Sequence, residues 1–157
     1  MKSIAQAFRN GLRLSLRAAR FGMREPATAF LLMRMAAWVI ILTLLVKLFP
    51  LGRVIALMTP ERVRRRGLAP ESTQERLARL LDMLLATDFW IFTPTCWKRA
   101  PVLYRYLALN GIRSRVVFGV RKGNEGSLDG HAWLEAEGHP LLEATSPNYR
   151  ETFSFPV

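Results

Sequence analysis

The sequence is poor in the residues from which metal and cofactor sites are built. It has one cysteine and two histidines among 157 residues. A single cysteine excludes an internal disulfide and leaves no cysteine pair with the spacing of a zinc site. The chain also lacks a glycine-rich phosphate loop and the aromatic-rich signature of RNA-binding domains. These absences predict a protein with no metal ion and no bound cofactor of its own, in a reducing cytoplasm.

Acidic residues are scarce beside basic ones. The chain has 12 Asp and Glu against 23 Lys and Arg, which gives a formal net charge of +11. Such a surface attracts acidic peptides, membrane headgroups or nucleic acid. Because no nucleic-acid motif accompanies the charge, we predict no nucleic-acid partner, and acidic peptides and membrane headgroups stay open. Basic segments at residues 9–24 and 61–66 are candidate docking faces, and the simpler interpretation is a solvated surface.

A long unbroken hydrophobic run is also missing. The segment 28–49 is strongly apolar, but Arg34 interrupts it and Lys47 lies near its end. The unbroken part, 35–46, has 12 residues, fewer than the roughly 20 that a spanning helix needs. We therefore expect a buried core helix at about 28–48. Peripheral contact with a membrane is the alternative.

The pattern of elements changes near residue 93. Before it, apolar residues recur at helical spacing, most clearly in "ERLARLLDMLL". After it comes a short helix from Cys96 to Asn110, then alternating strands at 116–120 and on both sides of Gly138. Helices first and strands last predict an α+β fold with an antiparallel sheet. We divide the chain into N-terminal helices at 1–70 and a core domain at 71–157.

The cysteine stands where a helix begins, and the following strands carry a histidine and an acid. Free amides and the helix dipole favour a thiolate at Cys96. This combination is used for nucleophilic catalysis, in which His131 moves the proton and an acid orients the imidazole. Glu143 is the candidate acid, and Glu135 and Asp129 compete for its role.

The length of the hairpin loop around Gly138 decides whether His131 and Glu143 share a face of the sheet. Side chains alternate along a strand, so a two-residue turn would place them on opposite faces. A loop of three or five residues would place them on the same face. The triad therefore requires an odd-length loop, or a bulge that restores the parity.

The stretches "CWKRAPVLYRYLALNGIRSRVVFGVRK" and "GHAWLEAEGHPLLEAT" resemble the lasso peptide leader peptidases, which have a transglutaminase-like, papain-related fold. Cys96, Gly111-Ile112, Gly119-Val120 and His131-Ala132-Trp133 match that family's pattern, over residues 94–145. Glu143 falls at the acid position, where the family usually has Asp. The resemblance implies a cysteine peptidase in which Cys96 is the nucleophile, His131 the general base and Glu143 the orienting acid.

The resemblance also implies partners. These are the lasso precursor peptide, a leader-recognition protein and an asparagine-synthetase-like cyclase that closes the ring. The chain has no room for the recognition domain that some members carry, which predicts a separate recognition protein. ATP is linked to leader removal in this family, but no nucleotide site is visible in the sequence.

Two other classes of function stay open. The same triad would serve an acyltransferase or transglutaminase, with an amine in place of water. Alternatively, the chain is a catalytically silent, membrane-associated binding module in which Cys96 is only packed.

Overall fold

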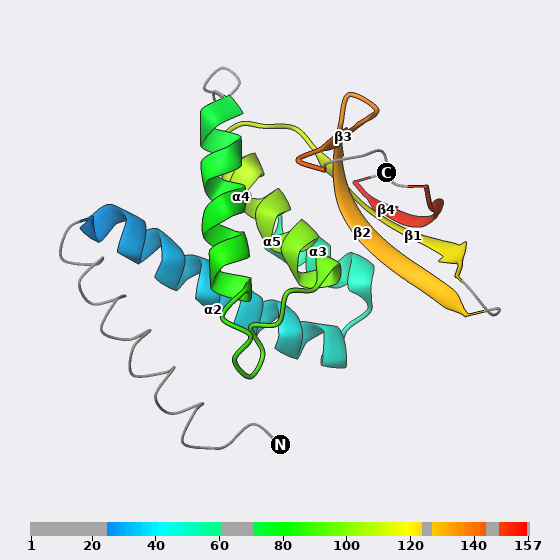
Figure 1. Ribbon diagram of the computed structural model, residues 1–157, viewed down its shortest axis with the longest axis horizontal. Coiled ribbons are helices and arrows are strands. Elements are labelled where there is room, and N and C mark those ends of the chain that lie inside the picture. Colours follow the sequence, from blue (N-terminus) through cyan, green and yellow to red (C-terminus); the bar gives the residue numbers. More distant parts are fainter. Residues whose placement is uncertain (1–24, 61–70, 124–126, 144–147, 157) are drawn as a thin grey trace. The chain divides into compact units, whose positions relative to one another are not determined.

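A computed structural model describes residues 25–60, 71–123, 127–143 and 148–156 (Figure 1). The chain divides into two compact units, Met1–Met35 and Ala36–Val157. The basic segments predicted as docking faces, 9–24 and 61–66, lie outside the described residues. So does the predicted domain boundary at residue 70, which stays a prediction.

The described helices carry the labels α2 to α5. Their bounds are Pro26–Leu48 for α2, Leu51–Met58 for α3, Glu71–Leu85 for α4 and Cys96–Leu109 for α5. The sequence patterns predicted α2, α4 and α5. The short helix α3 was not predicted, because Pro50 and Gly52 suggested only a helix end. Pro50 is instead the N-cap residue of α3, in the extended conformation that a helix entry requires.

Helix α2 corrects the expectation of a buried core helix. Val39 and Leu42 are fully buried, but Ile41, Leu44 and Leu48 are 37, 56 and 74% exposed. One face is therefore buried, and the opposite face is both apolar and exposed. By length and composition alone, α2 is able to cross a membrane, a test that the core helix of a soluble protein also passes.

The strands form one antiparallel sheet in the order β3-β2-β1-β4 (Figure 1). Their bounds are Arg115–Lys122 for β1, Leu128–Ala136 for β2, His139–Leu141 for β3 and Arg150–Phe155 for β4. The predicted α+β class with an antiparallel sheet is confirmed. Strand β4 was not predicted, and it pairs with β1 through a register shift between Phe118 and Gly119.

The core lies where α5 packs against β1 and β2, with α4 against α5. Leu103 and Leu107 of α5 are fully buried, as are Val116 and Val117 of β1. Helix α5 ends as the sequence predicts, since Gly111 has a φ of 82° in the left-handed region that glycine adopts readily. This packing fixes the first turn of α5 beside the middle of β2.

Candidate active site

Cys96 is the first residue of α5, and the residue before it is the N-cap. Thr95 is extended there, and its carbonyl accepts hydrogen bonds from the amides of Lys98 and Arg99. Its hydroxyl makes no capping hydrogen bond. The Cys96 side chain is half-buried, at the helix end where free amides point outward.

A buried lysine holds the segment that leads to the cysteine. The Lys98 side chain donates hydrogen bonds to the carbonyl of Ile91, at 2.7 Å, and to the hydroxyl of Thr93, at 2.6 Å. Lys98 is 5% exposed, and this burial lowers the pKa of its ammonium group. The two hydrogen bonds hold Ile91 and Thr93, and so they fix the backbone just before Cys96.

The three predicted site residues line one cavity. Cys96, His131 and Glu143 come from the start of α5, from β2 and from the segment after β3. The cavity has a volume of about 430 Å³. Its other lining residues include the apolar side chains of Leu85, Ala86, Pro94, Ala132 and Leu142 and the charged side chains of Asp82 and Arg99.

The hairpin between β2 and β3 does not have an odd-length loop, which was one of the two predicted ways to bring His131 and Glu143 to one face. The turn has two residues, Glu137 and Gly138, both with positive φ as in a type I′ turn. The pairing ends with Leu134 opposite Leu141. If it continued, it would place Glu143 opposite Ala132, on the face away from His131.

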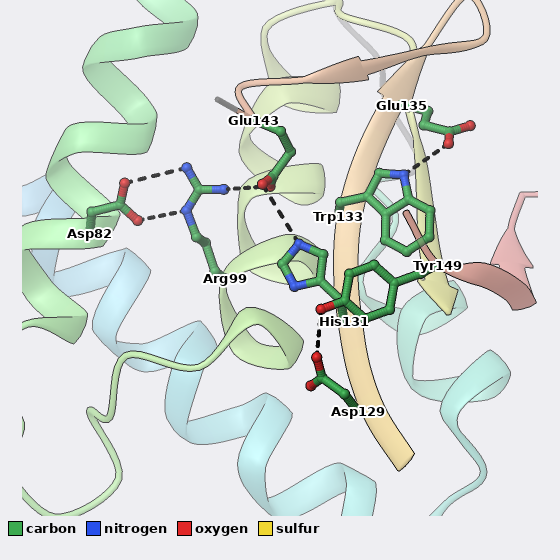
Figure 2. Close-up of polar contacts among 8 residues, drawn as sticks. All are labelled: Asp82, Arg99, Asp129, His131, Trp133, Glu135, Glu143 and Tyr149. Atoms are coloured by element: carbon green, nitrogen blue, oxygen red, sulfur yellow. Dashed lines mark hydrogen bonds and ion pairs between the residues drawn. The ribbon is translucent and has the colours of Figure 1, made fainter. Parts of the chain in front are cut away.

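Leu142 breaks the alternation of side chains that would keep Glu143 on the face away from His131. Its φ is 59°, in the left-handed region, so the chain turns out of the sheet directly after β3. Glu143 then reaches the face that carries His131. The distance between His131 Nε2 and Glu143 Oε2 is 3.6 Å, and Figure 2 shows the carboxylate directed at the ring. This distance is within the range of an ion pair and slightly longer than that of a hydrogen bond.

Glu135, the first competing acid, has other partners. Its carboxylate accepts hydrogen bonds from the indole of Trp133 at 2.8 Å and from Arg115 at 2.7 Å (Figure 2). The hydrogen bond to Glu135, and then the negative charges of Glu135 and Glu151, raise the pKa of the Arg115 guanidinium. Glu135 therefore stabilises the sheet rather than the imidazole of His131.

Asp129, the second competing acid, is also engaged elsewhere. It accepts hydrogen bonds from the phenol of Tyr149 at 2.8 Å and from Arg121 at 2.9 Å. The hydrogen bond from Tyr149 and then that from Arg121 lower the pKa of Asp129, and the same bond raises the pKa of Tyr149. Among the described residues, Glu143 is thus the carboxylate that contacts the His131 ring.

Residues 36–154 match the family described as the transglutaminase-like superfamily. The chain belongs to that superfamily. Its domain is compatible with cysteine peptidase activity or with transglutaminase-type transfer. Searches of curated proteins and of solved structures found no significant match.

Two aromatic rings of the transglutaminase-like domain pack beside the histidine. Trp133 is stacked with the His131 ring at 5.9 Å between centroids, and Tyr149 lies at 5.2 Å. Gly119, opposite His131 in the sheet, makes room for both, because a Cβ there would lie 2.9 Å from each side chain. Tyr149 was missed in the sequence, where a tyrosine beyond the hairpin carries no signal.

Arg99 and Asp82, two charged residues of the cavity, were also not predicted from the sequence. The Arg99 guanidinium contacts Glu143 Oε1 at 3.4 Å and both oxygens of Asp82, at 2.7 and 3.3 Å (Figure 2). Arg99 lies three residues after Cys96, a spacing that places it on the same helix face and was a usable signal. Among the described residues, no cluster of His, Cys, Asp or Glu is placed to hold a metal ion.

Proposed function

We propose that this protein is a cysteine peptidase that removes the leader from a lasso peptide precursor. The observation that carries the proposal is the meeting of Cys96, His131 and Glu143 in one cavity, with a helix N-terminus at the thiol. Membership of the transglutaminase-like superfamily supports thiol chemistry of this kind. The sequence resemblance over residues 94–145 supports the choice of a lasso precursor as substrate.

The chemistry follows from the position of each group. Because His131 Nε2 faces Glu143, the other ring nitrogen, Nδ1, is the one available to the thiol. The Cys96 thiolate attacks the scissile carbonyl, a C–S bond forms, and the C–N bond breaks as His131 protonates the leaving amine. Water then attacks the thioester, which releases the leader as a carboxylic acid and regenerates the thiol. Glu143 holds the ring and stabilises its charged form.

The proposal includes partners and a compartment. A separate leader-recognition protein presents the precursor, and an asparagine-synthetase-like cyclase uses the released core peptide. Any ATP is used by the wider maturation system rather than by this chain. The net charge of +11 supports docking to acidic protein surfaces, and the single cysteine supports a reducing cytoplasm.

Acyl transfer to an amine is the second candidate function, and the superfamily match supports it equally. The two functions share the thioester and differ in what attacks it. Water gives a leader with a free carboxyl group, whereas an amine gives an amide of different mass. A third candidate, a silent binding module, requires an unreactive Cys96.

The test is cleavage of the precursor by the full chain with the leader-recognition protein, in the presence and absence of a primary amine. Product masses should show a free leader carboxylate under both conditions. His139→Ala is a matched control, because His139 is exposed and lies outside the cavity. This variant should retain activity, and His131→Ala should lose it. An amidated leader as the main product would favour transfer, and an uncleaved precursor would reject the peptidase.

A further inference from the structure

The backbone leaves the sheet before the triad acid. The last paired residue of β3 is Leu141, and Leu142 turns the chain with a φ of 59°. Glu143 is therefore outside the ladder of hydrogen bonds that holds His131 on β2. Because sheet pairing does not orient this carboxylate, contacts of its side chain must do so.

Arg99 supplies such a contact. In Figure 2 the Glu143 carboxylate lies between the Arg99 guanidinium and the His131 ring. The oxygen Oε1 is 3.4 Å from Arg99 Nη1, and the oxygen Oε2 is 3.6 Å from His131 Nε2. Each oxygen thus has one cationic or potentially cationic partner, which fixes the rotation of the carboxylate.

Arg99 is itself held from the neighbouring helix. Asp82 of α4 accepts from Arg99 Nε at 2.7 Å and from Nη2 at 3.3 Å, in a two-pronged pair. The planar guanidinium presents donors along more than one edge, so one side chain can bind two carboxylates at fixed angles. A lysine, which is a point charge on a flexible stem, does not reproduce this geometry.

We propose that Arg99 is a positioning residue, which orients Glu143 toward His131 and is itself oriented by Asp82. The inference rests on the proposed triad and adds a residue to it. Arg99 acts through Glu143: with the carboxylate fixed, the His131 imidazolium is stabilised, and the thiolate–imidazolium pair with Cys96 forms at lower pH.

If Arg99 only stabilised the fold, its replacement would mainly lower the midpoint of thermal unfolding. The Arg99 and Asp82 side chains are 24 and 47% exposed, and ion pairs with this exposure contribute little to folding. We expect the midpoint of thermal unfolding of Arg99→Gln to change by less than about 5 °C. The effect should instead appear in the ionisation of the cysteine.

The test is the rate of iodoacetamide alkylation of Cys96 against pH, measured by intact mass on the full chain. The pH at which the wild-type protein reaches half of its maximal rate is the midpoint with which the variants are compared. Arg99→Gln should raise this midpoint by about one pH unit, and Glu143→Gln should do the same. Arg79→Gln, which removes an exposed arginine that pairs within α4, should leave it unchanged.

The double variant Arg99→Gln/Glu143→Gln decides between positioning and direct attraction. If Arg99 acts through Glu143, the double variant has the midpoint of Glu143→Gln alone. If the two shifts add, Arg99 stabilises the thiolate directly and the proposal is wrong. Arg99→Lys should show at least half of the shift of Arg99→Gln, and a wild-type midpoint in this variant would also overturn the proposal.

This assay contains no precursor, so its result is independent of the substrate. Coupling of Arg99 to Glu143 in a protein that cleaves no lasso precursor would reject the proposed peptidase and retain the positioning role. Precursor cleavage together with additive shifts would retain the peptidase and reject the positioning role. An unchanged midpoint in both Arg99→Gln and Glu143→Gln would overturn the role of the acid and the positioning role together.

Discussion

At the scale of single residues, hydrogen-bond partners separate three carboxylates that the sequence could not. Glu135 is bound by Trp133 and Arg115, and Asp129 by Tyr149 and Arg121. Glu143 remains beside His131. The sequence supplied all three as candidates. It favoured Glu143, but the contacts that exclude the other two were not visible in it, because Arg115, Arg121 and Tyr149 lie outside β2.

We predict that Glu143→Gln keeps the shape of the site but lowers kcat/KM for precursor cleavage, because the neutral amide stabilises the imidazolium poorly. Loss of the triad acid costs up to about four orders of magnitude in serine enzymes, and we expect less here, since a thiolate–imidazolium pair depends less on the acid. Glu143→Asp should be tolerated if the segment after β3 can adjust. Steady-state cleavage rates measure both.

Glu135→Gln and Asp129→Asn are the matched controls for that series. Both carboxylates lie on β2, the strand of His131, but bind other side chains. Their variants should keep most of the activity. A greater loss of activity in either variant than in Glu143→Gln would move the acid role to that residue.

Asp129 gives a prediction for stability against pH. The pKa of its folded form is lowered by Tyr149 and Arg121, so its contribution to stability is present above the unfolded pKa of about 3.9. It is lost as the pH falls through the lower, folded pKa. Asp129→Asn should therefore melt below the wild-type protein at pH 7, and this gap should close toward pH 3. Melting curves at a series of pH values measure it.

Tyr149→Phe removes the donor that contributes most to this lowered pKa. It should show the same trend with pH as Asp129→Asn, although less strongly, because the contact with Arg121 remains. A gap in melting temperature that stays constant between pH 7 and pH 3 in both variants would contradict the assigned interaction.

At the scale of elements, the hairpin shows where sequence patterns stop being informative. The alternation in β2 and the glycine at 138 were visible, so the hairpin was predicted. Whether its loop had two or three residues was not, because a glycine suits both. The left-handed Leu142 had no signal at all, since leucine rarely adopts that conformation. The triad depends on this one irregular residue.

Strand β1 gives a sharp test of the packing around the site. Gly119→Ala would place a Cβ 2.9 Å from Trp133 and Tyr149 and 3.0 Å from the Arg150 carbonyl. Because one of these contacts is backbone, we expect a loss of about 1–3 kcal/mol in the free energy of unfolding. Chemical denaturation measures it.

Gly130→Ala is the control for this crowding. Gly130 lies beside His131 on the paired strand, and the nearest atom to a Cβ there is 4.0 Å away. This variant should lose less stability than Gly119→Ala. Equal losses would mean that a general cost of replacing glycine, and not the ring contacts, explains the result.

Helix α2 bears on the alternative of membrane contact. Its exposed apolar face and its terminal Lys47 suit the surface of an anionic membrane. We predict peripheral binding at most, which ionic strengths near 1 M should weaken by screening. Leu44→Ser/Leu48→Ser should reduce co-sedimentation with anionic vesicles, and Met83→Ser, at an exposed site on α4, should not. Retention in cell membranes through salt and carbonate washes would instead indicate an inserted helix.

At the scale of the whole molecule, the order of elements was predictable and the meeting of distant side chains was not. Helices followed by strands gave the α+β class, and the match to the superfamily over residues 36–154 agrees with it. Arg99, however, contacts residues 17 and 44 positions away. No local pattern encodes such contacts, because they depend on how α4, α5 and the end of β3 pack together.

If Cys96 attacks the precursor as proposed, a thioester forms on its sulfur, and this intermediate can be trapped. The wild-type protein is mixed with precursor and recognition protein, quenched in acid within the first turnover and weighed intact. We expect a species heavier by the mass of the acylating leader, with the adduct mapped to Cys96. Cys96→Ala should show neither the adduct nor cleavage. Cleavage of the precursor at the wild-type rate by Cys96→Ala would show that Cys96 is not the nucleophile.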